Sequence, residues 1–308
     1  MPEDPIVTDT RPIQRAIART VTTPPPAPGF AGAGHTAVPV VEPSHFAEQD
    51  PFIVLMDDRV DMPPGVPIGG EHPHAGFEIA TFVVEGAVHD QDEGVLRAGD
   101  LQWMLAGRGV IHNEHAMPEG STRILQLWMT IPAEERWAEP HLETVSNETA
   151  PVRREAGAAV RVYSGSSGDA RAPARSHGHV PTTIVDVALE PGATLEQELP
   201  ASYNGFVYVL DGAVCVGAGD GTTLRTGQVG WLDRPEPRGP SALRLAAADG
   251  ERARLVLYAG EPQHRPIAMH GPFVGETRAD LMRVSRDYMD GRFDRVSALM
   301  RMGDASAR

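Results

Sequence analysis

Glycine and proline limit what this chain can fold into more than any other feature of its sequence. The 308 residues include 32 glycines and 28 prolines, together about a fifth of the chain. Because both residues interrupt helices and favour turns, this content favours short strands joined by tight connections. Apolar residues still make up 41% of the chain, which is enough for real cores, and the length is comfortable for two domains of ordinary size.

Short apolar runs continue this pattern from residue 36 onward. They recur about every ten residues between turn residues, and several are almost continuously apolar, as is typical of strands buried on both faces. The predicted strands of a first series are Ile53–Met56, Glu78–Glu85, Asp100–Leu105 and Arg123–Ile131. Those of a second series are Thr182–Leu189, Gly205–Leu210, Ala213–Val216, Gly230–Leu232 and Arg254–Tyr258.

Two passages occur once in each series. Val83–Val88 (VVEGAV) resembles Val209–Val214 (VLDGAV), and Arg97–Asp100 (RAGD) resembles Arg225–Gln228 (RTGQ). This repeat, together with the strand spacing, predicts an all-β protein made of two antiparallel β-barrels. We place the first barrel at residues 36–150 and the second at residues 181–280.

The remaining segments differ in composition from the barrels. Residues 1–35 contain a proline-rich stretch and are predicted to form a flexible arm, with a short helix at Arg11–Arg19. Residues 151–180 include a stretch rich in serine, glycine and alanine and suit a linker. Apolar residues at helical spacing predict a C-terminal helix and tail over residues 281–308.

Charge and composition exclude several classes of protein. The 27 basic and 42 acidic groups give a net charge of −15, which disfavours direct binding to nucleic acid or anionic lipid. The chain has no lysine, so a lysine Schiff base and a phosphate-binding lysine are excluded. Cys215 is the only cysteine, which excludes an internal disulfide. With no apolar run of about 18 residues, we expect a soluble, cytoplasmic protein.

Four potential metal ligands are spaced in two pairs. One residue separates His72 from His74, and one residue separates His112 from Glu114. Residues i and i+2 of a strand point to the same face, so each pair can direct two ligand atoms into one cavity. If the two strands are neighbours, three imidazoles and one carboxylate converge, a set that suits a borderline divalent metal ion. A lone His-x-His is often a surface pair, but two such pairs, each after a glycine-rich turn, favour a metal site.

A second carboxylate competes with Glu114 for the metal. Glu78 lies four residues after His74 and has the same strand parity, so spacing alone leaves open which glutamate binds. His115 has the opposite parity, and His89 lies in a charged loop, so both are expected outside the site.

His177 and His179 also have the spacing of ligands. They lie in the predicted linker, however, and no later pair accompanies them. We therefore expect the second barrel to hold no metal.

Several of these passages resemble the pirin family of the cupin superfamily. They are His72–Glu78 (HPHAGFE), Gly99–Glu114 (GDLQWMLAGRGVIHNE), Leu125–Trp128 (LQLW), Ala259–Pro262 (AGEP) and His270–Val274 (HGPFV). The resemblance implies two face-to-face cupin barrels of the jelly-roll type, with Fe(II) in the first one. It implies His72, His74, His112 and Glu114 as the ligands, with Glu78 in a supporting role in the pocket. Nickel, manganese, cobalt, copper and zinc are alternative metals. Ala75 departs from the family, which often has arginine at that position.

The same resemblance implies a function. Some pirin-like proteins are quercetin 2,3-dioxygenases, which open the ring of a flavonol with O₂, so the expected partners are a small aromatic substrate and O₂. Glu114 or Glu78 would act as the general base. The expected apolar walls are Phe77, Trp103, Met104 and Ile111. The alternative is a redox-responsive regulatory protein that contacts a transcription factor or a metabolic enzyme.

Overall fold

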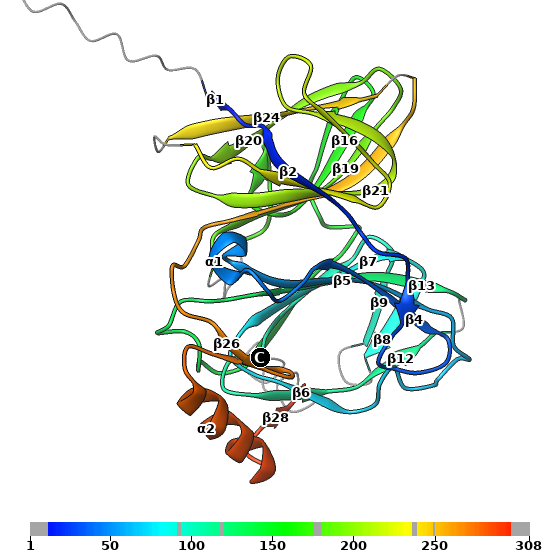
Figure 1. Cartoon of the computed structure of the whole chain (residues 1–308). Helices are drawn as coiled ribbons and strands as arrows, with labels where there is room; N and C mark the ends of the chain where they lie inside the picture. Colours follow the sequence, from blue (N-terminus) through cyan, green and yellow to red (C-terminus); the bar gives the residue numbers. More distant parts are fainter. Residues whose placement is uncertain are drawn as a thin grey trace, which may run out of the picture.

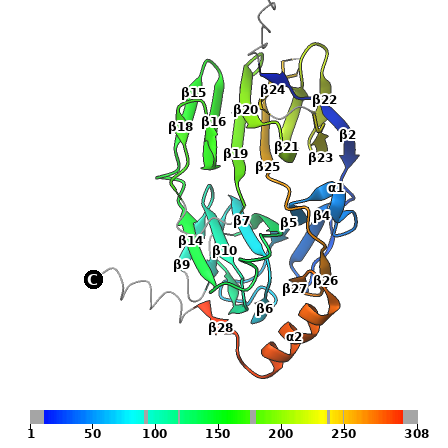
Figure 2. The same cartoon turned by 90° about the vertical axis from the view of Figure 1, so that its left-hand side faces the viewer.

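The computed structural model describes residues 12–90, 94–117, 120–174, 180–235, 239–248 and 250–296. Its strands form two barrels that stack face to face (Figures 1 and 2), which confirms the predicted all-β class with two barrels. Only two helices occur in this part of the chain, α1 (Phe46–Gln49) and α2 (Arg278–Met289). Neither is long enough to cross a bilayer.

The first barrel consists of one large sheet opposed by two small ones. The large sheet has the order β14 (His141–Val145), β10 (Leu101–Leu105), β7 (Glu78–Glu85), β13 (Thr122–Met129), β5 (Phe52–Val60), β4 (His35–Val41) and β3 (Ala27–Pro28). One small sheet has the order β28 (Asp294–Arg295), β11 (Val110–His112) and β6 (His72–His74). The other has the order β12 (Glu114–Ala116), β8 (Ala87–Asp90) and β9 (Gly94–Arg97).

The second barrel is built from a single eleven-stranded sheet. Its main path is β1 (Ile13–Gln14), β24 (Pro240–Ala247), β21 (Asn204–Val216), β25 (Ala253–Gly260), β19 (Thr182–Leu189), β16 (Ala158–Ser164) and β15 (Val152–Glu155). Off this path lie β2 (Ile17–Thr22), β20 (Thr194–Pro200), β22 (Thr222–Arg225) and β23 (Gln228–Leu232). Two small hairpins complete the fold, β17 (Ser166–Ser167) with β18 (Ala170–Arg171), and β26 (Ala268–His270) with β27 (Phe273–Gly275).

Alternation along each strand sorts its side chains between two cores. In β13, Leu125 and Leu127 pack into the core between the barrels, whereas Trp128 packs inside the first barrel. In β25, Tyr258 faces the core between the barrels and Leu257 fills the second barrel. These strands are therefore buried on both faces, as their almost continuous apolar sequences predicted.

A polar link joins the two barrels within this apolar surface. The guanidinium of Arg123 donates two hydrogen bonds to Asp57 (2.9 and 2.7 Å), and the hydroxyl of Tyr208 in the second barrel donates a third (2.7 Å). Burial raises the pKa of Tyr208, and the charge of Asp57 raises it further, so the hydroxyl keeps its proton. The buried carboxylate is thus paired and hydrogen-bonded, as a charge in an apolar interface must be.

The internal repeat forms the same turn in both barrels. Gly99 N donates to Val83 O (2.8 Å), and Gly227 N donates to Val209 O (3.0 Å) at the equivalent place. The first amide of each repeated tetrapeptide also donates to the side chain of its last residue, at 2.8 Å in both copies. The two barrels therefore share a local connection as well as an architecture.

The start of the described chain differs from the expected flexible arm. Residues 13–22 form β1 and β2 rather than a helix, and these strands pair with β24 and β23 of the second barrel. Between them Arg15 is buried and donates to Asp233 (2.9 Å). The partners lie more than 200 residues away in sequence, so no local pattern indicates this pairing.

The expected linker and C-terminal helix also differ from the structure. The 151–180 segment contains β15 and β16, which extend the second sheet. Helix α2 spans only Arg278–Met289, and the chain then forms β28, which pairs in parallel with β11. The pairing of β28 with β11 joins residues that are far apart in sequence, so no local pattern indicates it.

Candidate metal centre

Two short antiparallel strands carry the predicted histidines. In β6 and β11, His112 lies directly opposite His72, and Val110 lies opposite His74. The strands are therefore neighbours, as the sequence analysis required for the two ligand pairs to converge.

The three imidazoles point to one place. His112 Nε2 lies 2.9 Å from His72 Nε2 and 3.2 Å from His74 Nε2. Two nitrogen ligands at right angles, each about 2.1 Å from a metal, lie about 3.0 Å apart. The observed spacing therefore fits three nitrogens on adjacent coordination positions, and this cluster can hold a divalent metal ion.

The protonation of the cluster suits metal binding. The Nδ1–H of His72 donates to Gly70 O (2.8 Å), so its Nε2 carries the lone pair that faces the other two rings. Burial lowers the pKa of His74 well below its ordinary value, and the nearby His112 and His72 lower it further. A neutral imidazole is the form that binds metal.

The two candidate glutamates lie on different strands, Glu114 on β12 and Glu78 on β7. Among the described residues, the group of ligand atoms within 4.8 Å of one another contains the three histidines and neither glutamate. Glu114 is buried in β12, beyond a break between this strand and β11, and its carbonyl accepts a hydrogen bond from Ile68 N (2.7 Å). Glu78 lies on the same side of β7 as Ala80 and Phe82, which pack between the barrels.

The four-residue spacing between His74 and Glu78 therefore does not show that both side chains face the same cavity. Strand β6 ends at His74 and β7 begins at Glu78, and the turn between them includes Gly76 with φ of +87°. Alternation of side chains applies only within a continuous strand, so it cannot be extended across this turn.

Aromatic residues pack against the buried side of the cluster. The ring of Trp128 lies 5.3 Å from His74 and 4.4 Å from Phe77, between ring centroids. Trp103, expected as a wall of the pocket, packs instead in the core between the barrels. Trp128 is not among the walls expected from the sequence. Alternation along the predicted strand 123–131 nevertheless puts its side chain on the face opposite to those of Leu125 and Leu127.

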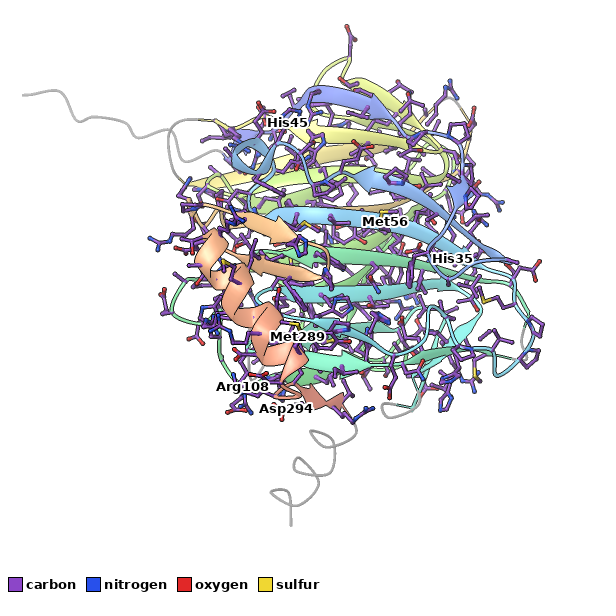
Figure 3. The ribbon with its side chains drawn as sticks, turned by 60° about the horizontal axis from the view of Figure 1, so that its bottom comes forward. His35, His45, Met56, Arg108, Met289 and Asp294 are labelled. Carbon is purple, nitrogen blue, oxygen red and sulfur yellow. The ribbon has the colours of Figure 1, made fainter. Side chains whose placement is uncertain are left out.

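The C-terminal segment returns from the second barrel to hold the metal-bearing strands. Val274 N donates to Ala75 O (2.9 Å), and a Cβ on Gly76 would lie 1.9 Å from Val274 O, so only glycine fits there. Further along, Arg108 and Asp294 form an ion pair (2.8 Å) beside β11, which Figure 3 shows below α2. Residues far apart in sequence thus support both ligand strands.

The other histidines that the structure describes lie outside this cluster. His89 and His115 face each other across β8 and β12, with ring centroids 6.3 Å apart. His270 is exposed in β26. His177 and His179 lie outside the described residues.

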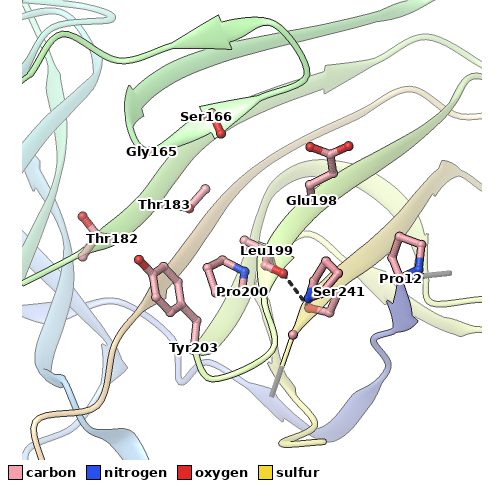
Figure 4. Close-up of a pocket in the computed structure, with 12 residues that line it drawn as sticks. Pro12, Gly165, Ser166, Thr182, Thr183, Glu198, Leu199, Pro200, Tyr203 and Ser241 are labelled. Carbon is pink, nitrogen blue, oxygen red and sulfur yellow. Dashed lines mark hydrogen bonds between the residues drawn. The ribbon is translucent and has the colours of Figure 1, made fainter. Parts of the chain in front are cut away.

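The second barrel has a cavity of a different kind at its edge. Its volume is about 600 Å³, and Figure 4 shows Tyr203, Pro200 and Thr183 among its walls. The hydroxyl of Ser241 in this wall donates to Leu199 O (2.8 Å). Within the part of the chain that the structure describes, the group of potential metal ligands lies in the first barrel and not here.

Comparison with known proteins identifies the family. Residues 38–129 match the Pirin family model, and residues 184–294 match the model of the Pirin C-terminal cupin domain. Pirin-like protein 2 of Arabidopsis thaliana is 35% identical over 251 residues, which cover 79% of this chain and 75% of the relative. The chain belongs to the pirin family.

Solved structures agree with this assignment. A quercetin 2,3-dioxygenase from Acinetobacter baumannii aligns over 91% of this chain and 98% of its own, with a TM-score of 0.79 and 27% identity. The Escherichia coli pirin YhhW, solved in complex with nickel(II), aligns over 79% of this chain and 99% of its own, with a TM-score of 0.58 and 23% identity. The second of these supports the fold alone.

Proposed function

We propose that this pirin-family chain is a metal-dependent dioxygenase that opens the ring of a flavonol or a related small aromatic compound with O₂. The observation that carries the proposal is the convergence of the three Nε2 atoms of His72, His74 and His112 inside the first barrel. The similarity to the Acinetobacter quercetin 2,3-dioxygenase along nearly the whole chain supports the reaction type.

We propose Fe(II) as the metal, with Glu114 completing the ligand set. Three neutral imidazoles suit several borderline ions, and nickel(II), named for the Escherichia coli pirin, is the first alternative to test. Glu114 is buried at the start of β12, and the resemblance of Gly99–Glu114 to the pirin family supports it as the fourth ligand. The orientation of Glu78 toward the core between the barrels makes it the weaker candidate for a ligand or a base.

The residues of the chain have distinct roles in this proposal. A bound divalent metal ion would polarise the substrate oxygens and lower the pKa of the substrate hydroxyl. The carboxylate of Glu114 would accept the proton of that hydroxyl as general base. Phe77 and Trp128 pack against the imidazole of His74, and the hydrogen bond to Gly70 O keeps His72 in the tautomer that can bind the metal.

The regulatory alternative has one structural observation in its favour. Helix α2 exposes three large apolar side chains, those of Met282, Tyr288 and Met289, and exposed apolar groups of this kind occur at contacts with other proteins. A metal-binding protein without turnover would fit this second role.

One experiment separates the two functions. The protein is reconstituted with Fe(II) without oxygen, and quercetin loss and O₂ uptake are then measured for the wild type, His112→Ala and the exposed control His270→Ala. We expect His112→Ala to lose metal and turnover and His270→Ala to keep both. If the protein binds metal stoichiometrically but no divalent metal supports turnover, the dioxygenase is refuted and the regulatory role is favoured.

A further inference from the structure

An exposed phenylalanine lies beside the metal-binding cluster. Phe30, in the turn between β3 and β4, is 71% exposed, yet its ring centroid is 5.9 Å from that of His72 in an edge-to-face arrangement. It precedes residues 38–129, the part that matches the Pirin model. The family match therefore assigns no role to this side chain.

The turn that carries Phe30 is anchored by a buried histidine. His35 accepts a hydrogen bond from Ala31 N at Nδ1 (3.1 Å), so its Nε2 carries the proton that is donated to Asp58 (2.8 Å). Backbone hydrogen bonds between His35 and Gly29 (2.9 Å) and between His35 and Gly32 (3.1 Å) close the turn. The ring of Phe30 then packs edge-to-face on His35 at 5.2 Å.

The other side of the Phe30 ring contacts the turn that orients His72. A Cβ on Gly69 would lie 2.0 Å from a ring carbon of Phe30, and Gly69 also has a φ of +79°, so the position requires glycine. The next residue, Gly70, supplies the carbonyl that accepts the Nδ1–H of His72. The phenyl ring is therefore held in place although most of it is exposed.

Phe30 lies beside the most exposed histidine of the cluster. His74 is 3% exposed and His112 is 5% exposed, whereas His72 is only half-buried. His72 is therefore the most exposed of the three ligand histidines, and Phe30 lies beside it. An aromatic ring held there offers an apolar face to whatever enters.

We propose that Phe30 is a specificity-determining residue that packs against planar aromatic ligands bound at the cluster and so selects them over aliphatic ones. Aromatic rings attract each other in offset or edge-to-face contacts at centroid distances of about 4.5–7 Å, the range in which Phe30 already contacts two imidazoles. An aliphatic ligand that coordinates through the same two oxygens gains nothing from this ring. The inference deepens the proposed function, because it rests on the metal site and on an aromatic substrate.

The test compares two ligands that coordinate in the same way but differ in shape. Protein loaded with Ni(II) is titrated with 3-hydroxyflavone and with acetohydroxamate, and both dissociation constants are measured for the wild type, Phe30→Ala, Phe30→Tyr and Met289→Ala. Met289 is a matched control, since it is 75% exposed but lies on α2, away from His35, the neighbour of Phe30, in Figure 3. Because Phe30 is largely exposed, Phe30→Ala should fold normally.

We expect Phe30→Ala to weaken 3-hydroxyflavone binding about tenfold and to leave acetohydroxamate binding and Ni(II) stoichiometry unchanged. Phe30→Tyr and Met289→Ala should bind both ligands like the wild type. Equal weakening of both ligands, no weakening of either, or a wild type without preference for the flavonol overturns the proposal.

The same measurements keep this inference separate from the proposed function. Binding of the flavonol that depends on Phe30, without turnover in the O₂ assay, supports the role of Phe30 and refutes the dioxygenase. If the protein turns over the flavonol but Phe30→Ala binds it as tightly as the wild type, the dioxygenase is supported and the role of Phe30 is refuted. A chain that takes up no divalent metal refutes both.

Discussion

The two barrels share an architecture and a repeated turn but differ in what fills them. The interior of the second barrel is a continuous apolar cluster that includes Val207, Leu243 and Leu257, all fully buried. The interior of the first barrel instead places buried His74 and His112 beside apolar neighbours. Two related barrels thus hold a packed core in one half of the chain and a polar cluster in the other.

This difference shows how a buried polar site is stabilised. Buried imidazoles reduce stability unless they are hydrogen-bonded or bound to a metal, and His74 Nδ1 has no hydrogen-bond partner among the described residues. The interior of the second barrel is mainly apolar, and its outer face contributes Phe206, Tyr208 and Tyr258 to the large core between the barrels. We infer that the second barrel stabilises the first, while the first holds the candidate metal centre.

Breaking the link between the barrels should have the largest effect on stability. Arg123→Ala leaves Asp57 buried without its cationic partner, which typically costs about 3–5 kcal/mol. If both barrels unfold together, the free energy of unfolding measured by urea denaturation should fall by this amount. A loss below about 1 kcal/mol would mean that the pair contributes no more than a surface ion pair.

A cavity in the second barrel should reduce stability without changing the metal site. Leu257→Ala removes a fully buried side chain and should lower the free energy of unfolding by about 2–5 kcal/mol. The folded variant should still bind one metal ion per chain, as measured by elemental analysis after reconstitution. Loss of metal from the folded variant would contradict the division of roles between the barrels.

Replacing a buried histidine of the first barrel by an apolar residue should raise stability rather than lower it. His74→Leu replaces a buried polar side chain by an apolar one of similar size, so the metal-free protein should become more stable by about 1 kcal/mol. Stoichiometric metal binding should be lost at the same time. A variant that is less stable than the metal-free wild type would show that the histidine contributes to packing rather than only to the site.

Acid should lower the stability of the first barrel through His74, by less than the substitutions above change it. His74 has a lowered pKa in the folded state, whereas in the unfolded state it takes up a proton near its ordinary value of about 6.5. Its contribution to stability is therefore present above about pH 6.5 and is lost as the pH falls toward the folded-state pKa. In EDTA-treated protein, urea midpoints from pH 7.5 to 5.5 should fall more steeply for the wild type than for His74→Leu. Parallel curves would contradict this assignment.

Local patterns predicted the parts of the molecule that depend on local rules. The strands Glu78–Glu85 and Thr182–Leu189 have the predicted bounds, because their almost continuous apolar sequences suit burial on both faces. The pairing of β6 with β11 also matches the condition on which the metal site was predicted. The spacing of His72 and His74 within one strand was sufficient to place both rings together.

Features that depend on distant contacts could not be predicted in this way. The pairing of β2 with β23 and the position of Phe30 beside His72 both involve residues that no local period connects. The orientation of Glu78 depends on a turn at Gly76 that interrupts the alternation from His74. Sequence spacing is reliable within a strand, whereas the turn between two strands resets it.

The most direct test of the first barrel as the metal-binding half is X-ray absorption spectroscopy of the protein reconstituted with Fe(II). The scattering pattern counts the imidazole ligands of the bound ion. The arrangement of His72, His74 and His112 predicts one ion per chain with three imidazoles, and a lower imidazole count in His112→Ala at whatever occupancy remains. A fully loaded wild-type site with no more than one imidazole would contradict the account.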